Sequence, residues 1–129
     1  MTVLECIRKA EQLLPGTAAP DGEPDPRWQA IIDVSEFIEQ EPEAVWNFAR
    51  RWGTYPDEDL RNAIATCLIE HLLQHHFDLM LPKVEQAVGA DPEFAETVRR
   101  CWAFGQADTP DNIKRLSRVL KSGKRAKKR

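Results

Sequence analysis

The sequence predicts an all-α fold, arranged as a right-handed stack of antiparallel helical hairpins with about six to seven helices. Apolar residues recur at intervals of three and four along most of the 129 residues. No stretch alternates apolar and polar residues as a half-buried strand would. Prolines, glycines and residues that favour helix N-caps divide this pattern into short segments. We therefore expect helices joined by tight turns.

The first third of the chain predicts two helices separated by an irregular loop. Thr2 is the expected N-cap of the first helix, which continues to Leu14. Residues 15–26 hold four prolines and two glycines and predict an exposed loop. Asp25, directly before a proline, is the expected cap of the second helix. The apolar stripe expected on that second helix is Trp28, Ile31, Ile32, Ser35 and Ile38.

The remainder of the chain predicts further helices separated by similar signals. Pro42 starts a helix that ends at Gly53, and the longest helix is expected from about Glu58 to His76. A shorter helix around 79–88 follows, with Pro82 in its first turn. The next helix begins at Asp91-Pro92, and Thr109-Pro110 caps a basic amphipathic helix. The final residues, 123–129, are expected to be disordered.

The charge divides the chain into two parts. Residues 1–112 carry 21 acidic and nine basic residues, a formal charge of −12. Residues 113–129 carry nine basic residues and no acidic one, a formal charge of +9. We expect residues 1–112 to form one helical-repeat domain and residues 113–129 to form a basic helix and tail. The two parts must be considered separately as binding surfaces.

A weak internal repeat appears when the expected helix starts are aligned. Asp25, Asp57 and Asp91 are spaced by 32 and 34 residues, about the length of one helical hairpin. Large apolar residues follow each aspartate after three and seven positions, and a small residue follows after ten. These are Trp28, Ile32 and Ser35; Leu60, Ile64 and Cys67; and Phe94, Val98 and Cys101. The alternative is that any capped amphipathic helix produces such a pattern.

Residues 43–73 resemble one unit of the HEAT (armadillo/HEAT-type) helical repeat family. An aromatic-rich first helix is followed by a short turn and a second helix of the form D-x-x-L-R-x-A-I-A-x-x-L, beginning at Asp57. Residues 79–104 resemble a second, degenerate unit. The resemblance implies that Asp57 or Asp59 caps the second helix. It also implies a small single-domain stack that offers a groove to another macromolecule, with no particular ligand.

Several classes of protein are disfavoured by composition. No apolar run reaches the roughly 18 residues that a membrane span needs, and residues 1–14 lack the core of a signal peptide. Cys6, Cys67 and Cys101 are an odd number of widely spaced thiols, which favours reduced cysteines over a disulfide framework. We expect a cytoplasmic protein without a membrane association, as a monomer or a weak dimer.

One cluster, residues 70–78, could carry metal or acid–base chemistry. His71 and His75 lie one helical turn apart, with Cys67 one turn earlier and Asp78 beyond them. Zinc is disfavoured, because Leu72 stands where a zincin motif requires glutamate. Cys67, His71 and His75, at i, i+4 and i+8, would also spread over about 12 Å along a straight helix, which is too far for one zinc ion. We predict no catalytic residue, no metal and no cofactor, and treat an enzyme that uses Glu70 with these groups as the third hypothesis.

Two sets of residues are candidates for binding a partner. Trp52 and Trp102 are expected in the core, whereas Trp46 lies off the line of Phe48 and Trp52 and is expected to face a groove. The candidate protein-binding residues are Trp46, Glu70, His71, Gln74, His75 and Asp78. The candidate nucleic-acid-binding residues are Lys114, Arg115, Arg118, Lys121, Lys124, Arg125, Lys127, Lys128 and Arg129.

The leading hypothesis for function is a non-enzymatic protein–protein interaction module with an acidic body. Its concrete form is an adaptor, or an inhibitor of the immunity or antitoxin kind that covers a basic toxin or enzyme. The alternative is an accessory protein that binds nucleic acid through its basic C-terminal segment. Against that alternative, no aromatic residue is interleaved with the basic residues of the tail.

Overall fold

The computed structural model describes residues 1–127, with side chains as far as Lys121. The described chain is all α-helical and contains no strand, as predicted. The helices are α1 Val3–Leu13, α2 Pro26–Ser35, α3 Pro42–Trp52, α4 Glu58–Ile64, α5 Glu70–His75, α6 Phe77–Ala90, α7 Pro92–Val98 and α8 Pro110–Lys127. A π-helical turn, Ala65–Ile69, joins α4 to α5, and a 3₁₀ turn, Gly105–Ala107, precedes α8.

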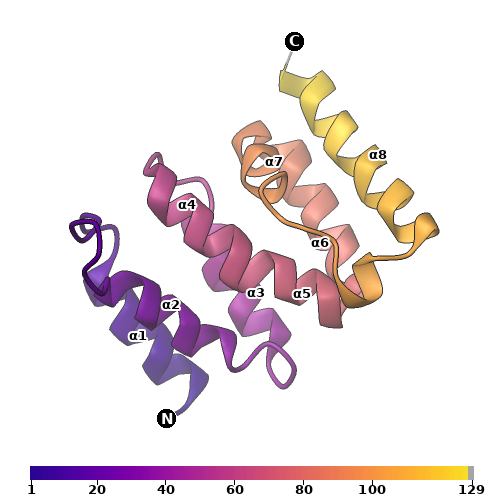
Figure 1. Cartoon of the computed structure of the whole chain (residues 1–129). Coiled ribbons are helices and arrows are strands. Elements are labelled where there is room, and N and C mark those ends of the chain that lie inside the picture. Colours follow the sequence, from indigo (N-terminus) through magenta and orange to yellow (C-terminus); the bar gives the residue numbers. More distant parts are fainter. Residues whose placement is uncertain (128–129) are drawn as a thin grey trace.

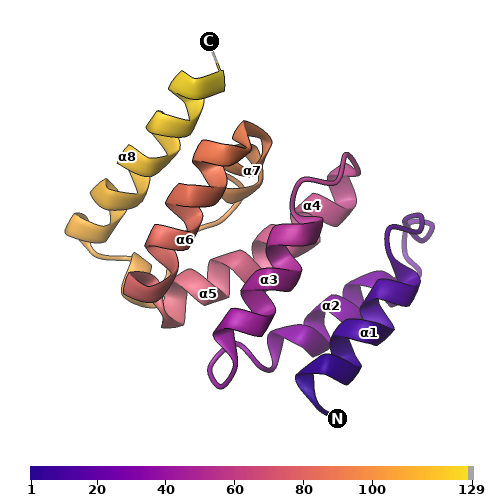
Figure 2. The same ribbon diagram turned by 180° about the vertical axis from the view of Figure 1, so that it is seen from behind.

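The helices form a row of two layers (Figure 1). Seen from one side, α2, α4–α5 and α7 lie in front of α1, α3 and α6, and the view from behind reverses this order (Figure 2). Helix α8 packs against α6 and α7 at the far end of the row from α1. Helices α1 and α8 therefore lie at opposite ends of the row.

The predicted aspartate N-caps are confirmed at the starts of α2, α4 and α7 in the front layer. The side chain of Asp25 accepts the backbone N–H of Arg27, and that of Asp57 accepts the N–H of Leu60. Asp91 caps α7 in the same manner. Each carboxylate satisfies an N–H that the first turn leaves without an intrahelical partner and opposes the positive end of the helix dipole.

The core runs between the two layers. Its fully buried side chains include Ile31 and Val34 of α2, Leu60 and Ile64 of α4 and Phe94 of α7. The indole of Trp46 on α3 meets the Phe94 ring edge-on, with 5.6 Å between ring centroids. Such an edge-to-face pair adds to the stabilisation from burying the two rings.

Four details of the helices differ from the prediction. Ile32 is exposed, and Val34 takes its place in the stripe, because the spacing 31–34–38 keeps one face of α2 towards the core. The long helix after Glu58 forms, but it contains the π-helical turn. Helix α6 starts at Phe77 and has Pro82 inside it. Helix α8 continues past Gly123 to Lys127, so the prediction of disorder is wrong for residues 123–127.

No helix within residues 1–127 combines the length and the hydropathy that crossing a membrane would require.

Candidate partner-binding surface

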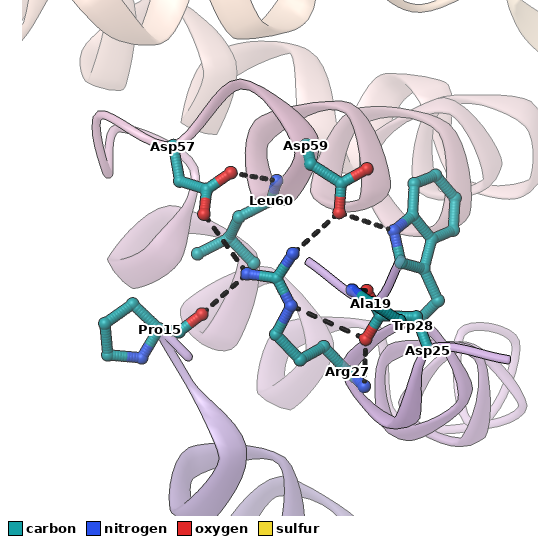
Figure 3. Close-up of polar contacts among 8 residues, drawn as sticks. All are labelled: Pro15, Ala19, Asp25, Arg27, Trp28, Asp57, Asp59 and Leu60. Atoms are coloured by element: carbon teal, nitrogen blue, oxygen red, sulfur yellow. Dashed lines mark hydrogen bonds and ion pairs between the residues drawn. The ribbon is translucent and has the colours of Figure 1, made fainter. Parts of the chain in front are cut away.

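Arg27 occupies the joint between the first two helices of the front layer (Figure 3). Only 4% of its surface is exposed. One terminal nitrogen donates to the carbonyl of Pro15 at 2.7 Å and to Asp57 at 3.2 Å, and the other donates to Asp59 at 2.7 Å. We use the name Arg27 joint for Arg27 with the Pro15 carbonyl, Asp25, Trp28, Asp57 and Asp59. It connects α2, the loop before α2 and the start of α4.

Asp25 and Trp28, the remaining members of the joint, also have partners within the chain. Asp25 accepts the backbone N–H groups of Ala19 and Arg27, and its carboxylate lies 3.5 Å from Arg27 Nε. Burial alone would raise the pKa of Asp25, but these hydrogen bonds and the guanidinium outweigh it and lower the pKa. The Trp28 indole donates to Asp59 at 2.9 Å. Because these groups are partnered within the chain, the joint is a structural clamp.

Asp57 serves the same joint from the side of α4. Its pKa lies below its ordinary value, chiefly because the backbone N–H of Leu60 donates to the carboxylate. The Arg27 guanidinium lowers the pKa further. One carboxylate therefore caps a helix and holds the neighbouring helix at the same time.

A polar hollow of about 250 Å³ lies where the turn after α2 meets α5. His75 Nδ1 lies 3.4 Å from Glu39, and His71 Nδ1 lies 2.9 Å from the side-chain oxygen of Gln74. The hollow is lined by Ser35, Glu36, Ile38, Glu39, Gln40, His71 and His75. Both histidines thus sit at the rim of a surface hollow, each beside a partner of its own. Within residues 1–127 no group of three or more His, Cys, Asp or Glu is placed to hold a metal ion.

Two of the predicted protein-binding residues are buried. Trp46 is only 6% exposed because Phe94 and the core cover most of it, but its remaining edge lines a surface hollow of about 340 Å³ between α3 and α6. Glu70 is 7% exposed, and its carboxylate accepts the backbone N–H of Trp102 at 2.7 Å. The other predicted residues, His71, Gln74, His75 and Asp78, are at least partly accessible. A partner would therefore touch only a small part of Trp46 or of Glu70.

Trp102 departs most from the prediction, since 75% of its surface is exposed. Helix α7 ends at Val98, so the helical spacing that placed this side chain in the core no longer applies. The segment after α7 is instead held by Glu70, and it turns at Gly105. Gly105 has a φ of +52°, and a Cβ there would lie 2.6 Å from the Gln74 side chain. Only glycine fits this close approach.

The exposed indole borders an apolar pocket of about 380 Å³ between this segment and α8. We name it the C-terminal pocket. Its lining is mostly aliphatic and leaves Ile113 46% exposed. The lining residues are Leu73, Arg99, Cys101, Trp102, Ala103, Ala107, Ile113, Leu116, Ser117, Leu120 and Lys121. A volume of this order is typical of pockets that take apolar side chains or small molecules.

Basic residues of α8 stand beside this pocket. Lys114, Arg118 and Lys121 are exposed, and within the described part of the chain they have no ion-pair partner. We name these three the basic stripe. Arg115 differs, because it pairs with Asp78 at 3.0 Å and lies over the Phe77 ring. The predicted residues Lys124, Arg125 and Lys127 lie on α8 beyond the described side chains, and Lys128 and Arg129 lie outside the described residues.

The cysteines carry no sign of nucleophilic chemistry. Burial raises the pKa of Cys6, Cys67 and Cys101, which keeps each thiol protonated near neutral pH. The Cys101 thiol donates to the carbonyl of Ala65 at 3.3 Å. These thiols behave as small packing groups.

Comparison of the chain with protein-family models, with curated proteins and with solved structures gave no match.

Proposed function

We propose that this protein is a non-enzymatic module that binds another protein at the C-terminal pocket. The observation that carries the proposal is Trp102, a large aromatic side chain that is 75% exposed beside an apolar pocket. Exposed apolar patches around a tryptophan mark protein contact sites, and tryptophan is enriched among the residues that dominate binding energy. By contrast, Trp46 and Trp52 are buried, so the exposure of Trp102 is particular to this end of the molecule.

We propose further that the architecture is HEAT-like. Three features support this classification: the two-layer row, the aspartate caps of α2, α4 and α7, and arginine links between these successive helices. Arg27 links α2 to α4, as described above. Arg61 of α4 links to α7 in turn, donating to the Thr97 hydroxyl at 3.0 Å and to the Glu93 carbonyl at 2.7 Å. Such stacks present extended surfaces to other macromolecules.

An inhibitor of the immunity or antitoxin kind is a specific form of interaction module that would use a second, acidic surface. Acidic side chains such as Glu39 and Glu43 are exposed around the turn between α2 and α3. An acidic surface of this kind complements the basic active site of a nuclease and would accelerate association. The partner found in the experiment below would be a basic toxin or enzyme if this form is correct.

Affinity purification of the tagged chain from its native host, with cross-linking and mass spectrometry, tests the proposal. We expect one stoichiometric protein partner, retained by Tyr55→Ser and lost from Trp102→Ser. Tyr55 is the matched control, because it is an exposed aromatic residue in a loop away from the pocket. Absence of any stoichiometric partner would contradict the proposed function.

Nucleic-acid binding is the second candidate function, and one observation favours it. Trp102 and Lys121 of the basic stripe line the same pocket, although the sequence separates them, and Lys114 and Arg118 lie with Lys121 at the adjoining hollow. An aromatic face next to cations is the usual platform for a single-stranded base. Anisotropy of a labelled single-stranded DNA 20-mer tests this function. If nucleic-acid binding is the function, the affinity for this DNA should fall steeply with salt concentration. Binding should be lost from the triple variant Lys114→Glu, Arg118→Glu, Lys121→Glu.

A further inference from the structure

We propose that the C-terminal pocket and the basic stripe together bind an acidic amphipathic helix of a partner protein. This inference depends on the proposed protein-binding function and names the chemistry of the partner at that site. The partner would carry apolar side chains on one stripe and Asp or Glu on the adjacent stripe. Two features of α8, one apolar and one basic, lead to this complement.

The apolar feature is a row along one face of α8. Ile113, Leu116 and Leu120 follow a spacing of three and four residues, so they share one side of the helix. They line the pocket together with Trp102, while the neighbouring Val119 is buried against the rest of the fold. The row therefore remains partly open to an incoming side chain. A helix that places leucine or aromatic residues at similar spacing would bury them here.

The basic feature runs parallel to this row. Lys114, Arg118 and Lys121 are spaced by four and three residues, so they also share one side of the helix. Lys114 directly follows Ile113, and Lys121 directly follows Leu120, so the basic residues lie beside the apolar row. All three of them, with Ile113 and Ser117, line another hollow of about 300 Å³ on α8, next to the C-terminal pocket. Apolar and cationic surfaces are thus continuous. From residue 113 to residue 121 the helix rises by about 12 Å, the length of roughly two turns of a partner helix.

The pairing of other charges makes this stripe available. Arg115 is held by Asp78, and Arg99 donates to Glu96 and to the carbonyl of Leu120 at the rim of the pocket. The three stripe residues have no such partner among the described residues, so their charges face solvent. Carboxylates on a docked helix would neutralise them. Each exposed pair contributes little, but three pairs acting with an apolar anchor give both affinity and orientation.

A protein helix suits this site better than a nucleic acid or a second copy. The pocket is lined by aliphatic groups that gain from burying apolar side chains, which a phosphate backbone lacks. The acidic residues 1–112, with a formal charge of −12, also repel a polyanion that extends beyond α8. A second copy would have to present its own acidic face, and the test below identifies that outcome.

Selection of 16-residue random peptides displayed on phage against the full chain tests the proposal. We expect enrichment of sequences with leucine or aromatic residues at helical spacing and with flanking Asp and Glu. Synthetic versions of the enriched peptides are then measured by fluorescence anisotropy. Replacement of their acidic residues by lysine should weaken binding by about tenfold, as three lost pairs of moderate strength predict.

Variants of the chain locate the binding site. Trp102→Ser, and separately the triple change Lys114→Glu, Arg118→Glu, Lys121→Glu, should each weaken the enriched acidic peptides by about tenfold or more. The matched control is Lys9→Glu, an exposed lysine on α1 at the opposite end of the row, which should change binding less than about twofold. Circular dichroism of each variant verifies that the helices are intact.

Four outcomes would overturn the inference: no enriched peptide, enriched peptides that are basic, binding unaffected by the α8 variants, or Trp102-dependent self-association in sedimentation experiments. Tighter binding of a single-stranded DNA 20-mer at the same residues would also overturn it and support the second candidate function. If the affinity purification yields a stoichiometric partner that Trp102→Ser loses but the triple change Lys114→Glu, Arg118→Glu, Lys121→Glu retains, the proposed binding at the C-terminal pocket survives and this inference falls. The two claims can therefore fail separately.

Discussion

The Arg27 joint and the basic stripe use the same kind of side chain for opposite purposes. At the joint, a single guanidinium is buried and donates to Pro15, Asp57 and Asp59. On α8, three cationic side chains extend into solvent without a partner among the described residues. A buried charge must be satisfied internally because water cannot reach it, whereas an exposed one remains available. The joint therefore stabilises the fold, and the stripe is free to bind.

The largest expected effect is at the joint. Arg27→Met should lower the free energy of unfolding by about 3 kcal/mol, because removing one partner of a buried ion pair leaves the others uncompensated. Because Asp57 and Asp59 keep some access to solvent, the expected loss lies at the lower end of the range for a broken buried pair. Urea denaturation followed by circular dichroism measures the change.

Arg51→Met is the matched control for that measurement. Arg51 pairs with Glu11 on α1 but is mostly exposed, so its loss should cost less than about 1 kcal/mol. Equal losses in the free energy of unfolding from Arg27→Met and Arg51→Met would show that the buried Arg27 joint stabilises the fold no more than an exposed ion pair does.

An intermediate effect is expected when the charge of Asp57 is removed. Asp57→Asn keeps a side chain that can cap α4 but loses the ion pair with Arg27, and should cost about 1.5 kcal/mol at pH 7. Because folding lowers the pKa of Asp57, its stabilisation is fully present above the unfolded pKa of about 3.9. That stabilisation is lost as the pH falls through the lower folded pKa.

The stability difference between wild type and Asp57→Asn should therefore narrow below about pH 4. Denaturation curves at pH 7, 4 and 3 measure this. Asp21→Asn, at an exposed loop residue, should change stability by less than about 0.5 kcal/mol at pH 7. A difference that widens on acidification would contradict the assignment.

Local sequence signals were sufficient for much of the fold. Asp25, Asp57 and Asp91 start helices because a short carboxylate before the first turn satisfies backbone donors, and this depends on neighbours in the chain alone. The π-helical turn at Ala65–Ile69 could not be predicted in this way. It lies in contact with α2, α3 and α7, so tertiary packing bears on its geometry.

The candidate binding surface was harder to predict, because it depends on where a helix ends. Trp102 continues the spacing of Phe94 and Val98, and this spacing predicts a position in the core. Helix α7 stops at Val98, and Glu70, distant in sequence, holds the following backbone through its N–H. The one available signal was Glu70 itself. A carboxylate within the apolar run 68–73 requires a donor from elsewhere in the fold.

The smallest expected effects on the free energy of unfolding distinguish Trp28 in the Arg27 joint from Trp102 at the C-terminal pocket. Trp28→Phe removes the indole donor to Asp59 and should cost about 1 kcal/mol, since Arg27 continues to satisfy that carboxylate. Trp102→Phe should change the free energy of unfolding by less than about 0.5 kcal/mol, because its indole is mostly in water and packs little. Thermal and urea denaturation of the two variants, measured under one set of conditions, make the comparison direct. A loss at Trp102 that equals or exceeds the loss at Trp28 would mean that Trp102 stabilises the fold, and its exposure would then no longer point to a partner.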